Sequence, residues 1–128
     1  MKNKLLWQVI DYKISKKLAI LGVKQESLFY WCHNTKWPND AEEWVLYSIN
    51  DWNGTKKGLG FKELYSAFTV AELGKILIAG FGTSKMMNGL WSYGSDDNHY
   101  SDLGEEKTEA NARAKLLIYL IENKLIKI

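Results

Sequence analysis

The clearest amphipathic pattern in the chain lies near its C-terminal end. Apolar side chains recur there at helical spacing, at Ala110, Ala114, Leu117, Ile118 and Ile121. Thr108 can cap the first turn, so we predict a helix over residues 109–123. Further apolar surface lies outside the stripe, at Leu116, Tyr119 and Leu120. An apolar arc this wide needs more than one neighbour, either a sheet plus another helix or a second subunit.

Two shorter helices are predicted from capping signals. Thr69 and Glu72 match a capping box, apolar residues follow at helical spacing, and residues 80–82 supply glycines that end the helix. Ser15 can cap a two-turn helix that ends at Gly22. Residues 4–10 form an apolar run that is too short to assign, and helix or strand both remain open for it.

Three segments have the composition of strands. Residues 28–33 and 44–49 are rich in aromatic and β-branched side chains, and the segment between them contains Pro38 and polar residues. This connection is too short for a crossover helix, so we predict an antiparallel pair. We expect a short extended piece around residues 61–68.

A second hairpin is predicted further along, from residues 90–93 and 98–103 around a turn at 94–97. The elements together predict a single α+β domain over residues 1–128. We expect an antiparallel sheet of about four strands, with the two helices that follow Thr69 and Thr108 packed on it.

Composition narrows the class of protein. The chain has 128 residues, of which 46% are hydrophobic and 25% charged, and this suits one globular domain. Its longest apolar run has six residues, from Leu116 to Ile121, so we expect no membrane span and no secretory signal. Cys32 is the single cysteine and cannot form an internal disulfide. We therefore expect a cytoplasmic protein.

The net charge of +2 is small, but its distribution is uneven. Residues 1–24 contain six lysines and one aspartate, a local balance of +5, and Arg113 is the only arginine of the chain. The scarcity of arginine disfavours sequence-specific recognition of duplex DNA. The N-terminal lysines are interpreted as a solubilising face, with weak docking of an acidic partner or a phosphate backbone as the alternative.

Several segments together resemble a known family. They are residues 14–18, 21–31, 68–74 and 109–125. These segments resemble a family of small uncharacterised proteins carried by prophages and integrative elements of gut bacteria such as relatives of Bacteroides. The resemblance implies a cytoplasmic protein of a mobile element, and it supplies no activity and no functional residues. Residues 75–80 depart from the Leu-Pro that often follows the segment corresponding to 68–74 in that family.

Two segments look like phosphate-binding loops. Residues 54–60 lack the Gly-Lys-Ser/Thr ending of such a loop, and residues 80–85 follow a predicted helix instead of a strand. We therefore expect neither segment to bind phosphate, and we interpret the glycines of the second as helix termination.

The candidate catalytic and metal-binding residues are also few. Cys32, His33 and His99 lack the spacing of a metal site, and Cys32 with His99 would form a nucleophile–base pair only if the fold brought them together. The acidic residues around Asp96, Asp97 and Asp102 are interpreted as turn formers. We therefore predict no catalytic residues, no metal site and no cofactor.

The high aromatic content gives the main functional hypothesis. Seventeen aromatic residues include six tryptophans, and the candidate partner-binding residues are Trp37, Trp52, Trp91 and Tyr93. We predict a non-catalytic interaction protein that binds a protein partner, or itself, through an exposed aromatic patch. The alternative is a module that binds a nucleotide or single-stranded nucleic acid by stacking, with the N-terminal lysines on the phosphates.

Overall fold

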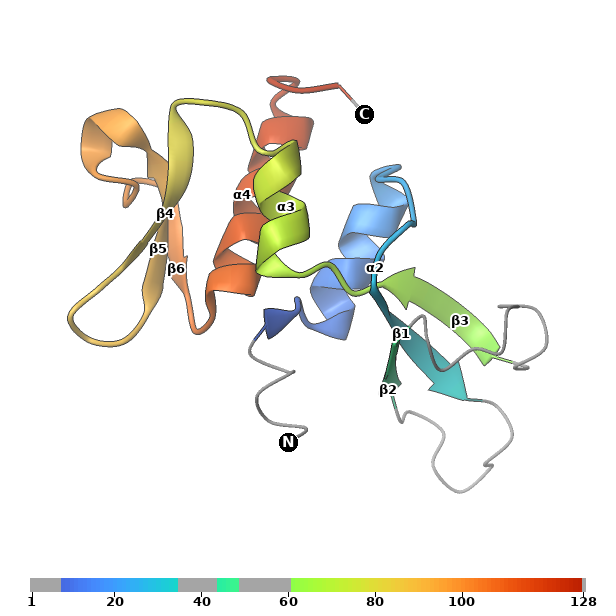
Figure 1. The fold of residues 1–128 in the computed structure, drawn as a ribbon. Coiled ribbons are helices and arrows are strands. Elements are labelled where there is room, and N and C mark those ends of the chain that lie inside the picture. The colour runs from blue at the N-terminus through green and yellow to red at the C-terminus, as the bar shows by residue number, and fades with distance from the viewer. Residues whose placement is uncertain (1–7, 35–43, 49–60, 128) are drawn as a thin grey trace.

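The computed structural model describes residues 8–34, 44–48 and 61–127 (Figure 1). Within these residues the helices are α2 (Tyr12–Ile20), α3 (Val70–Ile76) and α4 (Glu109–Glu122). The strands are β1 (Phe29–Asn34), β2 (Trp44–Ser48), β3 (Phe61–Ser66), β4 (Phe81–Lys85), β5 (Trp91–Ser95) and β6 (Gly104–Glu106). A short 3-10 turn, η3 (Asp96–Asn98), follows β5. The predicted α+β class is confirmed.

The described strands form two antiparallel sheets, where one sheet of about four strands was expected. The strand orders are β2-β1-β3 and β4-β5-β6. The chain passes through α3 between β3 and β4, and Figure 1 shows the helices lying between the two sheets. Apolar side chains lie on several sides of α4, so the helix packs against the second sheet on one side and against α2 and α3 on the other.

The first sheet contains the predicted antiparallel pair. β1 is its central strand, and Trp31 lies opposite Leu46 on β2 and opposite Tyr65 on β3. The extended piece expected around residues 61–68 is β3, which completes the sheet on the other edge of β1.

The second sheet differs from the predicted hairpin. β5 pairs with β4 through a tight turn at residues 86–90, in which Gly89 has a φ of 88°. On its other edge β5 pairs with residues 104–106 instead of 98–103, so that Tyr93 lies opposite Gly104. The reason is that η3 and the left-handed backbone of His99 and Tyr100 take up the residues that were expected to pair.

Helix boundaries follow their capping residues. The predicted capping box at Thr69 and Glu72 is present, and Thr108 caps α4 by accepting from the Asn111 N–H at 3.1 Å. The start of α2 was predicted too late. The Asp11 carboxylate caps it by accepting from the Ile14 N–H at 2.9 Å, and Ser15 is buried inside the helix.

The main core surrounds α4. Its fully buried side chains include Leu116, Leu117 and Leu120, and the helix packs against α2, α3 and all three strands of the second sheet. Neighbours within the chain therefore cover the wide apolar arc, which agrees with the first of the two alternatives, a sheet plus another helix.

Candidate functional site

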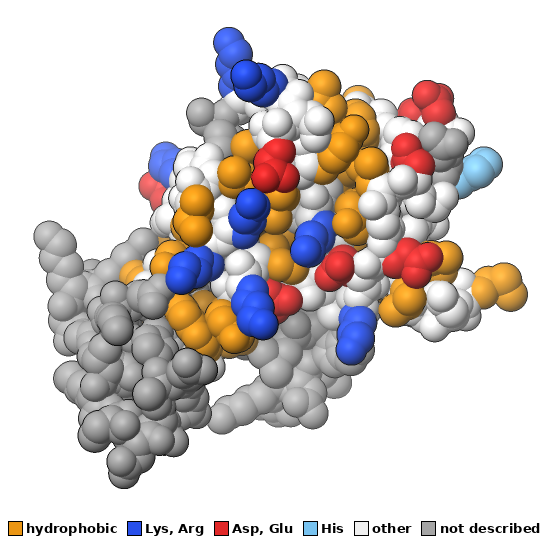
Figure 2. Space-filling view, turned by 180° about the vertical axis from the view of Figure 1, so that it is seen from behind, with side chains coloured by type: hydrophobic (Ala, Val, Ile, Leu, Met, Phe, Trp, Pro, Cys, Tyr) orange, Lys and Arg blue, Asp and Glu red, His pale blue; other side chains and the backbone are white. Residues whose placement is uncertain are grey.

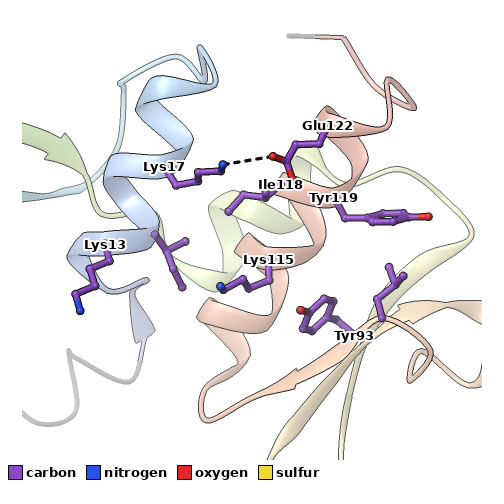
Figure 3. A pocket seen from close by; sticks show the side chains of 9 residues that line it. Lys13, Lys17, Tyr93, Lys115, Ile118, Tyr119 and Glu122 are labelled. Carbon is purple, nitrogen blue, oxygen red and sulfur yellow. Dashed lines mark ion pairs between the residues drawn. The ribbon is translucent and has the colours of Figure 1, made fainter.

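A groove with a volume of about 490 Å³ runs along α4 on the side away from α3 (Figures 2 and 3). It is bounded by α2 on one side and by the second sheet on the other. We call it the basic groove, and the residues that line it are Lys13, Ile14, Lys17, Tyr93, Leu103, Lys115, Ile118, Tyr119 and Glu122. In Figure 2, lysines gather around apolar side chains on this face.

Helical periodicity places these side chains together. Those from α4 are spaced by three or four residues, from Lys115 to Glu122, and such residues share one face of a helix. Lys13 and Lys17 are four residues apart on α2 and border the opposite side; in Figure 3 Lys17 reaches toward Glu122, whereas the Lys13 side chain extends away from α4. The groove therefore has a helical floor and a wall of positive charge.

The charges of the groove are only partly neutralised within the molecule. Lys17 pairs with Glu122 at 3.3 Å, and both side chains are about half exposed, at 48% each. No carboxylate in the described part of the chain pairs with Lys13 or Lys115. Two lysines beside the apolar side chains of Ile14 and Ile118 thus have no carboxylate partner in the part of the chain that the structure describes.

Tyr93 provides a hydroxyl group on the sheet side of the groove. Its ring lies against Gly104 on β6, where a Cβ atom would come within 2.6 Å of the hydroxyl oxygen. Burial raises the pKa of Tyr93, and the nearby carboxylate of Glu106 raises it further. The hydroxyl therefore keeps its proton at neutral pH and can donate a hydrogen bond.

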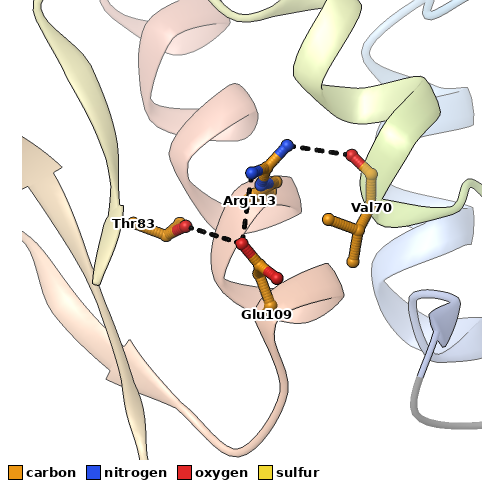
Figure 4. Close-up of polar contacts among 4 residues, drawn as sticks. All are labelled: Val70, Thr83, Glu109 and Arg113. Atoms are coloured by element: carbon orange, nitrogen blue, oxygen red, sulfur yellow. Dashed lines mark hydrogen bonds and ion pairs between the residues drawn. The ribbon is translucent and has the colours of Figure 1, made fainter. Parts of the chain in front are cut away.

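Arg113 fixes the position of α4 on the side opposite the groove (Figure 4). Its guanidinium donates to the Val70 carbonyl at 3.1 Å and pairs with Glu109 at 3.1 Å. The same carboxylate oxygen of Glu109 accepts from the Thr83 hydroxyl at 3.4 Å. These contacts link α4 to α3 and to β4, and they hold the floor of the groove relative to its sheet wall.

The predicted partner-binding residues have different outcomes. Tyr93 lines the basic groove. Trp91 shares a face of β5 with Tyr93 and is partly buried, but it does not line the groove. Trp37 and Trp52 lie outside the described residues. Lys13 and Lys17, from the N-terminal lysines, do line the groove.

Sequence reasoning missed Lys115 as a site residue and treated Tyr119 only as extra apolar surface. Both lie on the same face of α4, and their relation to α2 depends on the tertiary fold. The available signal was the four-residue spacing of Lys115 and Tyr119 on a helix already predicted to be amphipathic.

The aromatic side chains described in and around the first sheet pack against one another. Trp44 stacks on Tyr12 at 4.9 Å between ring centroids and on Tyr65 at 5.8 Å. Trp31 is buried, and its indole N–H donates to the Ile10 carbonyl at 2.7 Å. These rings fasten α2 and the preceding segment to the sheet.

The fold keeps the candidate nucleophile and base apart. Cys32 is buried in β1, and burial raises the pKa of its thiol to about 12. His99 lies in the connection after β5, on the other sheet (Figure 1). The structure therefore does not bring Cys32 and His99 together.

The other sequence candidates belong to turns and strands. Asp102 accepts from the Ser95 N–H at 2.8 Å, and Asp96 and Asp97 lie in η3, which confirms their interpretation as turn formers. Across the described ranges, no three His, Cys, Asp or Glu side chains are placed to hold a metal ion. Residues 81–85 form β4 and enter a hairpin. The prediction that Gly80 and Gly82 end the preceding helix is wrong, because α3 ends at Ile76 and Gly82 lies in the strand.

The comparisons with known proteins give no match. No protein-family model, curated protein or solved structure matches the chain. The family resemblance therefore remains a prediction. No helix in the described residues is long and apolar enough to cross a membrane.

Proposed function

We propose that the protein is a non-catalytic binding protein whose basic groove takes up an acidic segment of a protein partner. One observation carries the proposal. Lys13 and Lys115 border the groove without a carboxylate partner among the described residues, beside the apolar side chains of Ile14 and Ile118. A bound segment that carries carboxylates next to apolar side chains would pair with the two lysines and cover the two isoleucines.

The size and composition of the groove support a peptide-like occupant. Pockets of about 300–1,000 Å³ accept ligands the size of a few side chains, and the basic groove lies in this range. Its positive charge comes from lysines, which act as mobile point charges and impose little geometric selection on a carboxylate. Tyr93 adds a hydrogen-bond donor at the sheet wall.

The assignment of a non-catalytic role is supported by the state of the reactive groups. The Cys32 thiol is buried and keeps its proton, and His99, the candidate base, lies on the second sheet away from it. A binding role requires only the arrangement of charge and apolar surface described above. Carriage by a mobile element and a cytoplasmic location are part of the proposal and rest on the sequence.

A second candidate is the binding of single-stranded nucleic acid. The observation that favours it is the presence of Tyr93 and Tyr119 beside Lys115, since aromatic rings next to lysines suit bases and phosphates. Against it, Trp44 already stacks on Tyr12 and Tyr65 within the protein. We therefore prefer an acidic protein segment.

The test is a fluorescence anisotropy titration with three labelled probes. They are a short peptide of alternating Glu and Leu, the same peptide with Lys in place of Glu, and oligothymidylate. The variant K13E/K115E reverses the charge of the groove. The variant K75E/K85E makes the same change in net charge at two exposed lysines that do not line it.

We expect the acidic peptide to bind the wild type and K75E/K85E, and its affinity to fall by about tenfold or more in K13E/K115E. The lysine peptide should not bind. Equal affinities in the two double variants would show that the groove is not the site. Binding of oligothymidylate without binding of the acidic peptide, if abolished by K13E/K115E, would favour the second candidate.

A further inference from the structure

A group of acidic residues lies in the second sheet and its connections, away from α2. Residues 86–106 contain five carboxylates and neither lysine nor arginine. Residues 8–24, which include α2, contain four lysines and one aspartate. The segment around α2 therefore has an excess of positive charge and residues 86–106 an excess of negative charge, which favours head-to-tail contact between copies.

The connection between β5 and β6 carries three of these five carboxylates. Asp96 and Asp97 lie there in η3, and both are exposed. The connection is held in shape by several hydrogen bonds, including those from the Tyr100 N–H to the Ser95 carbonyl at 2.8 Å and from the Ser95 N–H to the Asp102 carboxylate at 2.8 Å. We call residues 96–102 the acidic connection.

Part of the acidic connection packs on the face of the second sheet that is turned away from α4. The ring of Tyr100 packs over Gly82, on one face of the second sheet. Thr83, the next residue on β4, points the other way and bonds to Glu109 of α4. The groove lies on the α4 side of the sheet, where Leu103, the residue that follows the connection, lines it.

We infer that the acidic connection of one copy docks in the basic groove of a second copy, with Asp96 and Asp97 facing Lys13 and Lys115. This inference rests on the proposed function and names the partner as the chain itself. The two surfaces differ, so the contact is heterologous and each copy can bind one neighbour at either end. The contact is small and driven by charge, and the association is weak and sensitive to salt.

The experiment is sedimentation velocity of the full chain and of two variants with one surface reversed in each. K13E/K115E reverses the charge of the basic groove and leaves the acidic connection unchanged. D96K/D97K reverses the charge of the acidic connection and leaves the groove unchanged. In a mixture of the two variants, opposite charges meet at both contacts, because the substituted glutamates of one groove face the substituted lysines of the other variant's connection. The mixture should therefore form dimers and larger species, while each variant alone, with like charges at its contacts, should be monomeric.

The wild type should form dimers and larger species as its concentration approaches about 1 mM, and salt near 1 M, where the Debye length is about 3 Å, should dissociate them. K75E/K85E should behave as the wild type. Circular dichroism checks that every variant is folded.

A wild type that stays monomeric at low salt would overturn the inference. So would association of either variant alone, or a mixture that does not dimerise although the wild type does. If the wild type is monomeric and the groove still binds the acidic peptide, the inference fails and the proposed function stands. If neither association nor peptide binding occurs, both fail.

Discussion

At the scale of single residues, the charged groups of the basic groove are not equivalent, because among the described residues only Lys17 of its lysines is paired with a carboxylate. Glu122 neutralises Lys17 and also repels an acidic occupant. The pair is about half exposed, so it contributes little to folding. Glu122→Gln should therefore raise the affinity for the acidic peptide by about two- to fivefold, with a change in unfolding free energy below about 0.5 kcal/mol. Anisotropy and thermal denaturation measure the two effects, and an unchanged or weaker affinity would contradict this account of the groove.

Cys32 makes a second residue-scale prediction, which concerns pH. Burial raises its pKa from 9.0 to about 12, so between these values the folded protein keeps the thiol proton and the unfolded chain releases it. Stability from this group is complete below pH 9 and falls as the pH rises, by at most about 1.4 kcal/mol per pH unit.

The measurement is denaturant unfolding of the wild type and Cys32→Ala between about pH 7 and about pH 11. The alanine variant provides the control, since it retains every other titrating group. The stability difference between the two proteins should be constant up to about pH 9 and then shrink. A difference that stays constant over the whole range would show that the thiol titrates normally in the folded protein.

At the scale of secondary-structure elements, Arg113 joins three of them. Its replacement by methionine removes the hydrogen bond to the Val70 carbonyl and the ion pair with Glu109, and we expect a loss of about 1–3 kcal/mol. Lys115→Met is the matched control on the same helix, with an expected change within about 0.5 kcal/mol. Chemical denaturation measures both, and equal effects would mean that Arg113 does not link α4 to its neighbours.

Gly74 lies on α3 next to the guanidinium of Arg113, so its substitution also probes the contacts of Arg113 with Val70 and Glu109. Replacement of a helical glycine by alanine ordinarily stabilises by about 1 kcal/mol. Here the new Cβ would meet the Arg113 guanidinium, which must then leave its place near the Val70 carbonyl. Gly74→Ala should therefore give no gain in the wild type and a gain of about 1 kcal/mol in the R113M background. The same gain in both backgrounds would contradict this packing.

Most elements with strong local signals were predictable. The capping box at Thr69 and the cap at Thr108 satisfy helix ends within a few residues, so they can be recognised in the sequence. β4 was missed because its residues, Phe81–Lys85, include a glycine and small polar side chains. Their strand conformation is set by pairing with β5, which is a tertiary effect that local propensity does not report.

At the scale of the whole molecule, the separation into two sheets and the groove between α2 and the second sheet were not predictable. Lys13 and Lys115 are about a hundred positions apart, and no local pattern links them. The sequence did show the basic N-terminal region and the candidate Tyr93. It did not show that the two meet across α4, because their meeting depends on how the helices pack between the sheets.

The central claim, that the basic groove is the binding site, is tested most directly by mapping the acidic peptide on the protein. In a titration of ¹⁵N-labelled protein, the amide shifts should change at Lys13 and Lys17 on α2, Lys115 and Tyr119 on α4, and Tyr93 on β5. The amides of β1 and β3 should not change. Shifts centred on the first sheet, or no shifts at any peptide concentration, would contradict the claim.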